Sequence, residues 1–189
     1  MTVARLLVIG AGSYGRAVAE VALASDEHQL VGFVDDRWPD LPPIWGLPVL
    51  GRLADLPRLA GLADAAVAAI GDNAARKAAC AQAQSAGFGL ANLIHPRATV
   101  SPSAVLGHGL TVMAGAVIGT EAHIADGALV NAGAVVDHHA QVGAFAHLGV
   151  GACMGGGSVL AAGAWLSAGN TLGPGQRQSS DKPGAATRL

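Results

Sequence analysis

The chain has 189 residues, enough for one or two domains, and its net charge of −2 gives no electrostatic case for binding nucleic acid. Although 51% of the residues are apolar, no apolar run is long enough to insert into a membrane. The two cysteines, Cys80 and Cys153, have no CxxC spacing, so we expect free thiols in a cytoplasmic protein.

Residues 1–95 follow the order of a small parallel α/β sheet. Buried strands are predicted at 6–9, 30–34, 64–70 and 90–94, a short strand at 49–51, and helices at 16–24, 53–59 and 74–86. The first apolar run passes directly into a glycine turn with no cleavage-like region after it. We therefore predict a first strand rather than a signal peptide.

The segment Gly10-Ala11-Gly12-Ser13-Tyr14-Gly15 joins the first strand to the first helix, and Asp35-Asp36 ends the second strand. This order of strand, glycine turn, helix, strand and acid is typical of a nucleotide-binding turn. Backbone amides at the helix N-terminus favour a phosphate, and Asp35 or Asp36 can accept hydrogen bonds from a ribose or a base. A tight turn without a ligand and an NAD site are alternatives. Hydride transfer is disfavoured, because the chain continues into a repeat instead of a substrate domain.

A second ligand position is predicted at Gly71-Asp72-Asn73, which follows a strand of the same sheet. Asn73 suits a helix N-cap, and we expect this to be its main role. Arg76 and Lys77 lie in the first turn of the following helix, where the helix dipole disfavours positive charge. They are expected to be surface charges or partners of a bound phosphate.

A period of six residues dominates the second half of the chain. Every sixth residue is aliphatic or Met, at positions 100, 106, 112, 118, 124, 130, 136, 142, 148, 154, 160, 166 and 172, and the residue two places earlier is nearly always small. Helices repeat at three and four residues and strands at two, so this longer period indicates stacked repeats. We predict a left-handed parallel β-helix in which three hexapeptides form one triangular coil. The aliphatic residues point inward, the small residues fit the corners, and the prism stops at about Pro174–Gln176.

The predicted architecture is therefore a Rossmann-like parallel α/β sheet at 1–95, a hexapeptide-repeat left-handed parallel β-helix at 96–175, and a polar tail at 176–189. The tail, QRQSSDKPGAATRL, has the composition of a flexible segment.

Polar side chains gather on two consecutive coils of the predicted β-helix, at Asn131, Asp137, His138, His139 and His147. From their places in the hexapeptide, His138 should point outward near a corner and His147 outward from a face. The two are half a coil apart, so a site that uses both would form where two subunits meet. Histidine titrates near neutral pH, so His138 can take a proton from an attacking amine or hydroxyl. An exposed polar surface is the plain alternative. A zinc site fits poorly, because the adjacent His138 and His139 should point to different sides.

These motifs resemble the bacterial sugar O- and N-acyltransferases of the sialic acid O-acetyltransferase type, which include enzymes acting on nucleotide-linked 4-amino-4,6-dideoxy sugars. The resemblance rests on GAGSYG at 10–15, FVDD at 33–36, AIGDN at 69–73, NLIHP at 92–96 and NAGAVVDHHAQVGAFAHLGVGA at 131–152. It implies an acetyl-CoA-dependent N-acetyltransferase of a nucleotide-linked amino sugar, assembled as a homotrimer and needing no metal. Sugar O-acetylation is the near alternative.

The resemblance also implies roles for individual residues. His138 is similar to the general base of the family, with His139 and Asp137 beside it. The residues implied to bind acetyl-CoA are His147, Gly156 and Ala168. The residues implied to bind the nucleotide sugar are Gly10, Gly12, Ser13, Tyr14, Asp35, Asp36, Gly71, Asn73 and Asn131.

Two features depart from the family pattern. Members commonly carry an acid directly after the base histidine, and this chain has His139 there. The repeat also ends near Leu172, where members are expected to continue for further coils that help to hold CoA. A non-catalytic trimeric scaffold that binds sugar nucleotides is therefore the alternative from a different class.

Overall fold

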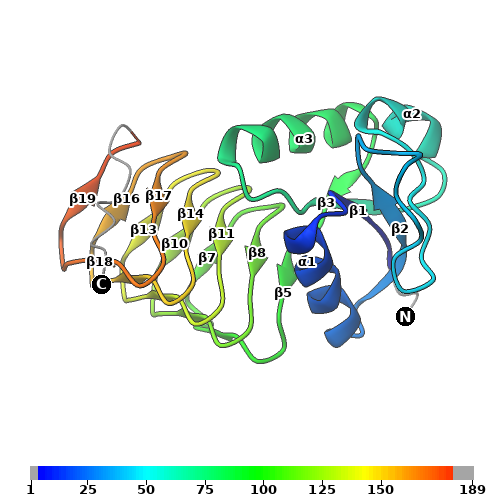
Figure 1. The fold of residues 1–189 in the computed structure, drawn as a ribbon. Coiled ribbons are helices and arrows are strands. Elements are labelled where there is room, and N and C mark those ends of the chain that lie inside the picture. Colours follow the sequence, from blue (N-terminus) through cyan, green and yellow to red (C-terminus); the bar gives the residue numbers. More distant parts are fainter. Residues whose placement is uncertain (1–3, 181–189) are drawn as a thin grey trace. The chain divides into compact units, whose positions relative to one another are not determined.

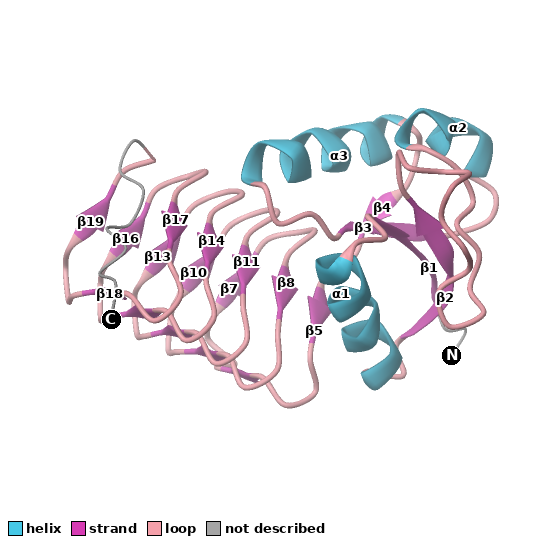
Figure 2. Cartoon of the chain, viewed as in Figure 1, coloured by secondary structure: helices cyan, strands magenta, loops and turns pink. Residues whose placement is uncertain are grey.

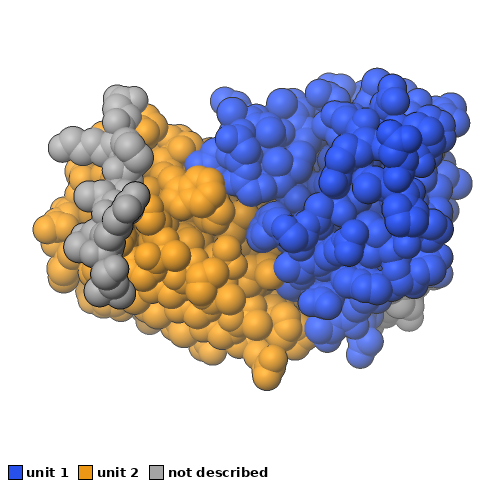
Figure 3. Space-filling view, in the orientation of Figure 1, with its two compact units in different colours: residues 1–93 blue, residues 94–189 orange. Residues whose placement is uncertain are grey.

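The structure is a computed structural model that describes residues 4–180, and the chain divides into two compact units between Leu93 and Ile94. Figure 3 colours the two units. Within residues 4–180, no helix combines the length and the hydrophobicity that a membrane span requires.

The first unit is built on a parallel sheet of four strands, β1 (Ala4–Ile9), β2 (His28–Val34), β3 (Ala65–Ala68) and β4 (Gly89–Leu90), in the order β2-β1-β3-β4. The connections contain α1 (Ser13–Ala24), a 3₁₀ helix (Leu53–Asp55), α2 (Leu56–Leu59) and α3 (Asn73–Ser85). The chain leaves β1 toward β2 and returns on the other side at β3 (Figure 2). This reversal is a topological switch point, the place where open α/β sheets bind ligands at the carboxyl ends of their strands.

The aliphatic runs predicted as strands form the core of this unit, because Leu6, Val8, Phe33 and Val67 are completely buried. Two predictions need correction. Residues 90–94 do not form one strand. β4 pairs with β3, whereas β5 (Leu93–Ile94) belongs to a different sheet, together with later strands of the chain. Val49 makes only an isolated bridge with Phe33, so 49–51 is not a regular strand.

The second unit is a triangular parallel β-helix made of two-residue strands (Figure 1). After β5 these strands are β6 (Thr99–Val100), β7 (Val105–Leu106), β8 (Thr111–Val112), β9 (Val117–Ile118), β10 (His123–Ile124), β11 (Leu129–Val130), β12 (Val135–Val136), β13 (Gln141–Val142), β14 (His147–Leu148), β15 (Cys153–Met154), β16 (Val159–Leu160), β17 (Trp165–Leu166), β18 (Thr171–Leu172) and β19 (Arg177–Gln178).

Three parallel sheets form the three sides of the prism. The first contains β5, β8, β11, β14 and β17, the second β6, β9, β12, β15 and β18, and the third β7, β10, β13, β16 and β19. Val135 pairs with Cys153 and Leu129 with His147, so one coil takes eighteen residues, as predicted. The period-six aliphatic residues fill the interior, and the small residues are buried beside them.

From residue 109 onward, each corner contains one residue in the left-handed region, where a residue with a Cβ is disfavoured. These residues recur every six positions from 109 to 175, and nine of the twelve are glycine. The three that are not glycine are Glu121, His139 and Phe145.

The prism continues past the predicted stop at Pro174–Gln176. In β19, Arg177 and Gln178 pair with Val159 and Leu160, and the Ala161 N–H donates to the Gln178 carbonyl at 2.9 Å. Backbone ladder bonds do not require an apolar side chain, which is why the hexapeptide pattern missed this strand. The Gln178 side chain instead donates from Nε2 to the Trp165 carbonyl at 2.8 Å. The rest of the predicted flexible tail, residues 181–189, lies outside the described residues.

Candidate active site

The glycine turn after β1 is shaped by close backbone packing. Gly10 has a φ of 106°, and a Cβ there would lie 2.7 Å from the Ala69 carbonyl oxygen. A Cβ at Gly15 would lie 2.0 Å from the Gly10 carbonyl oxygen, so this position also excludes a side chain. Gly12 is the N-cap of α1, with no side-chain cap hydrogen bond, and Ser13 and Tyr14 begin the helix. The backbone of this helix end can therefore approach an anion.

Asp35 holds the glycine turn against the end of β2. Its Oδ2 accepts from the Ala11 N–H at 2.8 Å and from Arg37 Nη2 at 2.9 Å. Its Oδ1 accepts from the Arg37 N–H at 3.0 Å and from Arg37 Nε at 2.8 Å. The Arg37 guanidinium holds the pKa of this carboxyl far below its usual range. Four bonds fill the acceptor sites of a carboxylate, so Asp35 is placed to fix the turn rather than to meet a ribose.

Asp36 is the more accessible of the two acids. Its Oδ1 accepts from the Leu53 N–H at 3.0 Å, and the residue is exposed. A cavity of about 300 Å³ lies at this end of the sheet, lined by Gly10, Asp35, Asp36, Leu53, Ile70, Ala75 and Ala78. Three residues predicted to contact the nucleotide sugar, Gly10, Asp35 and Asp36, therefore line one cavity at the switch point.

The loop after β3 differs from the prediction. The N-cap of α3 is Asp72, whose Oδ1 accepts from the Ala75 N–H at 2.8 Å, and Asn73 is the first residue of the helix. The Asn73 Oδ1 instead accepts from Arg76 Nη2 at 2.9 Å. Asp and Asn are equally good caps, so the sequence alone could not decide between these neighbours.

Arg76 is a buried residue, contrary to the expectation of a surface charge. It is only 2% exposed, and its Nη1 donates to the carbonyls of Ile70 at 3.0 Å and Gly71 at 3.2 Å. Burial lowers the pKa of its guanidinium. Arg76 therefore fixes the Ile70–Asn73 loop, and Lys77 is exposed.

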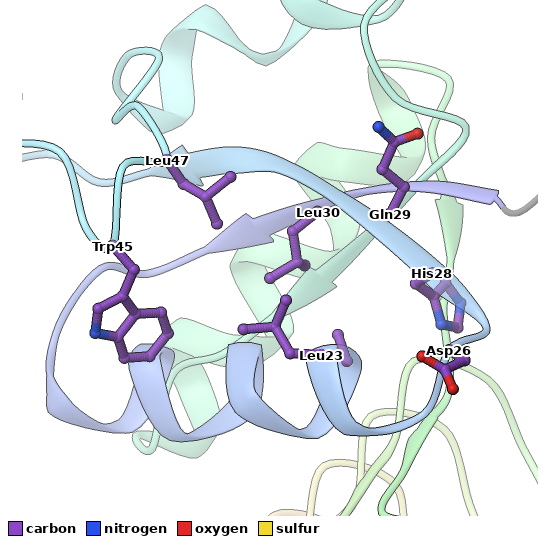
Figure 4. Close-up of a pocket in the computed structure, with 8 residues that line it drawn as sticks. Leu23, Asp26, His28, Gln29, Leu30, Trp45 and Leu47 are labelled. Carbon is purple, nitrogen blue, oxygen red and sulfur yellow. The ribbon is translucent and has the colours of Figure 1, made fainter.

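A larger cavity, of about 600 Å³, lies beside α1 and β2 (Figure 4). Leu23, Leu30, Trp45 and Leu47 surround it, with His28 and Asp26 at one end. Its lining is mainly apolar, and it includes none of the residues predicted to bind the nucleotide sugar.

The second group of predicted site residues lies at the corner after β12. The His138 N–H donates to Asp137 Oδ1 at 2.7 Å, and His138 Nε2 lies 3.8 Å from Asp137 Oδ2, too far for a hydrogen bond. The His138 side chain is 60% exposed. Gly156 lies one coil further along, and a Cβ there would be 2.5 Å from Cε1 and Nε2 of the His138 ring. The imidazole therefore lies over the Gly156 backbone.

His139 contacts its neighbour instead of pointing away from it. The two Nδ1 atoms are 3.1 Å apart, and the rings meet edge to face at 84°. The prediction that the rings point to different sides is wrong, because His139 has a φ of 58° and the chain is not extended here. His139 Nε2 lies 3.0 Å from Glu121 Oε2. Glu121 was not predicted, although it lies one coil, eighteen residues, before His139.

His147 lies on β14, in a different sheet from the strand that precedes His138, as its spacing predicted. It occupies an outward strand position, but the residue is only 4% exposed and its ring packs on Trp165, with ring centroids 3.9 Å apart. Asn131 Oδ1 accepts from the Ala132 N–H at 2.8 Å, and Ala168 is exposed in the turn after β17. Among residues 4–180, no three His, Cys, Asp or Glu side chains are arranged to hold a metal ion.

Comparison with known proteins gives a consistent result. Residues 5–83 match the family described as the PglD N-terminal domain. The acetyltransferase domain of PglB from Neisseria gonorrhoeae FA1090, solved with acetyl coenzyme A, is 34% identical over 93% of this chain and 96% of that chain, with a TM-score of 0.79. PerB from Caulobacter crescentus, solved with CoA and GDP-perosamine, is 34% identical over 97% of this chain and 93% of that chain, with a TM-score of 0.73. No curated protein sequence matches the chain.

These comparisons correct one sequence-based expectation. The chain covers 96% of the PglB domain and 93% of PerB, so the expectation that relatives continue for further coils does not hold for either of them. WeeI from Acinetobacter baumannii AYE, at 18% identity and a TM-score of 0.60, shares the fold.

Proposed function

Because this chain belongs to the PglD-like sugar N-acetyltransferase family of the hexapeptide-repeat superfamily, we propose that it transfers the acetyl group of acetyl-CoA to the amine of a nucleotide-linked amino sugar. The family contains PerB, which was solved with CoA and GDP-perosamine. A 4-amino-4,6-dideoxy sugar linked to GDP or UDP is therefore the first substrate class to test.

The observation that carries this proposal is the placement of His138. Its Nδ1 contacts His139 at 3.1 Å, while its Nε2 lies above the Gly156 backbone on an exposed corner. One ring nitrogen thus contacts the protein, and the other faces the backbone at Gly156, which we assign to binding the thioester of acetyl-CoA. A general base needs this arrangement, in which the protein orients the ring and the substrate meets the free nitrogen.

The reaction that we propose has one direct acyl transfer. The sugar amine attacks the thioester carbonyl carbon, the new C–N bond forms, and the C–S bond breaks as CoA leaves as a thiolate. His138 Nε2 takes the proton that the amine loses and returns it to the CoA sulfur. Backbone N–H groups near Gly156 would stabilise the oxyanion of the tetrahedral intermediate. The remaining residues in this proposal are Asp137 and His139, which we assign to catalysis, and His147 and Ala168, which we assign to binding acetyl-CoA.

We assign the nucleotide sugar to the cavity at the β1–β3 switch point. The open N-terminus of α1, at Gly12, Ser13 and Tyr14, suits a phosphate, and Arg37 Nη2 lies 3.8 Å from the Cβ position of Gly12. Arg37, which the sequence pattern did not single out, is paired with Asp35, and its guanidinium would offer further N–H donors beside that phosphate. Asp36, Gly71 and Asn73 are the remaining contacts assigned in this unit, and Asn131 is assigned to the sugar.

We also propose that the protein works as a homotrimer in the cytoplasm. Outward positions of the second sheet carry Val117, Val135 and Cys153, and Val117 is 37% exposed in the single chain. An apolar stripe on a β-helix side is suited to packing against another subunit. The exposed ring of His138 would then face the side of a neighbouring prism that carries His147 and the Trp165 ring packed on it. The free thiols of Cys80 and Cys153 fit a reducing compartment.

Calorimetry followed by single-residue replacement tests the proposal. We expect acetyl-CoA to bind, and we expect product only when a nucleotide-linked amino sugar is added. His138→Ala should lower kcat by about 10²- to 10⁴-fold while retaining acetyl-CoA binding and oligomeric state. Full activity of this variant would contradict His138 as base. Absence of acetyl-CoA binding to the wild-type protein would favour a scaffold that binds sugar nucleotides.

A further inference from the structure

The carboxylate nearest to the imidazole rings of His138 and His139 comes from the preceding coil. Glu121 and His139 occupy the same corner position in consecutive coils, and Glu121 Oε2 lies 3.0 Å from His139 Nε2. His139 Nδ1 in turn lies 3.1 Å from His138 Nδ1. The three side chains form a continuous line from a carboxylate, through one imidazole, to a second imidazole.

Glu121 and His139 both carry a side chain at a corner where the fold favours glycine. Glu121 has a φ of 54° and His139 a φ of 58°, whereas nine of the twelve equivalent corners hold glycine. A left-handed non-glycine residue carries a conformational cost, and such residues concentrate at functional sites. The Glu121 N–H also donates to Ser103 Oγ at 3.1 Å, which braces this corner from the coil before it. The geometry is therefore held at a cost in backbone energy.

The proton positions along this line follow from the acceptor character of the carboxylate. An ionised Glu121 can only accept, so a neutral His139 carries its proton on Nε2 and leaves Nδ1 as an acceptor. His138 must then donate from Nδ1, which leaves Nε2 of His138 without a proton. This is the nitrogen that lies over Gly156. The line therefore selects the one neutral tautomer of His138 that can act as a base from Nε2.

We propose that Glu121 is a positioning residue that acts through His139 to hold His138 in its Nδ1–H tautomer. The proposal rests on the proposed acetyl transfer only for the role of His138, since the tautomer is a property of the free protein. Among residues 4–180, the acidic side chains beside His138 and His139 are Asp137 and Glu121. Asp137 Oδ2, at 3.8 Å from His138 Nε2, is too distant to hold a proton on that nitrogen.

Glu121→Gln is the most direct test, because an amide keeps the shape and can donate as well as accept. We expect kcat to fall by about tenfold or more while the KM for acetyl-CoA stays within about twofold. Glu20→Gln makes the same chemical change at an exposed site on α1 and should leave kcat unchanged.

A second-site variant separates positioning from general damage. His139→Glu in the Glu121→Gln background puts a carboxylate directly beside His138, and Glu121 itself shows that this kind of corner accepts a glutamate. We expect this double variant to recover most of the activity that Glu121→Gln loses. Recovery cannot be explained if Glu121 only supports the fold.

Imidazole nitrogen NMR of the free protein gives a readout that does not need the substrate. The wild-type protein should show His138 protonated on Nδ1 at neutral pH, and Glu121→Gln should shift it toward the Nε2–H form. The proposal is overturned if Glu121→Gln changes neither the tautomer of His138 nor kcat. If no nucleotide amino sugar is acetylated but the tautomer responds to Glu121, the proposed function fails and this assignment stands.

Discussion

The ring of His138 lies over Gly156, the residue one coil further along the prism, and a Cβ at 156 would come within 2.5 Å of its Nε2. Gly156 is not in the left-handed region, so its backbone can accept alanine. The glycine is therefore required by the space that the imidazole occupies and not by backbone conformation.

Gly156→Ala should displace the His138 ring and lower kcat by about tenfold or more, since general-base catalysis depends on hydrogen-bond geometry. The melting temperature should change little, because the ring is an exposed side-chain end that can move. Steady-state kinetics and a thermal melt check both parts. Gly61→Ala is the matched control, because a Cβ there meets nothing within 4 Å. Wild-type kcat in Gly156→Ala would show that the ring position is unimportant.

Ser158 is a buried hydroxyl in a column of small residues, and its Oγ has no hydrogen-bond partner among the described residues. Removing an unsatisfied buried hydroxyl removes its desolvation cost, so Ser158→Ala should raise the free energy of unfolding by about 1 kcal/mol. Ala116→Ser creates the reverse change in another fully buried small position and should destabilise the protein. Urea unfolding of both variants measures the effect, and a less stable Ser158→Ala would show that the hydroxyl stabilises the folded chain.

Asp35→Asn should destabilise the protein at neutral pH by about 1–2 kcal/mol, a value that allows for the exposed Arg37 side chain. The folded pKa of Asp35 is depressed, chiefly by the Arg37 guanidinium. Its stabilising contribution is therefore complete above its unfolded pKa of about 3.9 and is lost as pH falls below that value. Urea unfolding at pH 7, 5 and 3 should show the gap between wild type and variant closing only at the lowest pH (roughly one unit below that pKa). A gap independent of pH would exclude the charge as its cause.

Glu121→Gly should separate stability from activity. The substitution relieves about 1 kcal/mol of left-handed strain, and the exposed contact with His139 that it removes contributes at most about as much. The variant should therefore be at least as stable as the wild type and yet have a lower kcat. A thermal melt beside an activity assay tests this prediction. A variant that is less stable but keeps the wild-type kcat would show that Glu121 has only a structural role.

The sequence predicted the architecture because the prism has one inward residue per hexapeptide, and Val136, Leu148 and Met154 show that period directly. It could not predict the contact between Glu121 and His139. That contact depends on a left-handed backbone at both residues, and only three non-glycine residues among the repeating corners adopt it. The eighteen-residue coil was available as a signal, and comparing each polar corner residue with the one a coil earlier would have found Glu121.

For the glycine turn, too, the sequence predicted the backbone unit but not the side-chain contacts. The spacing of Gly10, Gly15 and Asp35 predicted a strand–turn–helix unit, and the structure has it. The sequence pattern does not contain the information that Arg37 folds back on Asp35, because that contact is between side chains only two residues apart. It also does not decide whether Arg76 is buried, since the three acceptors it meets lie in the loop that it closes.

The most direct measurement is mass spectrometry of the products formed from acetyl-CoA and GDP- or UDP-linked 4-amino-4,6-dideoxy sugars. We predict a product heavier by one acetyl group on the sugar nitrogen, released together with one CoA thiol, and we predict that it forms about 10²- to 10⁴-fold more slowly in His138→Ala. The same nucleotide sugars recovered unmodified, with an oligomer that binds them and acetyl-CoA intact, would contradict the assignment of acetyl transfer.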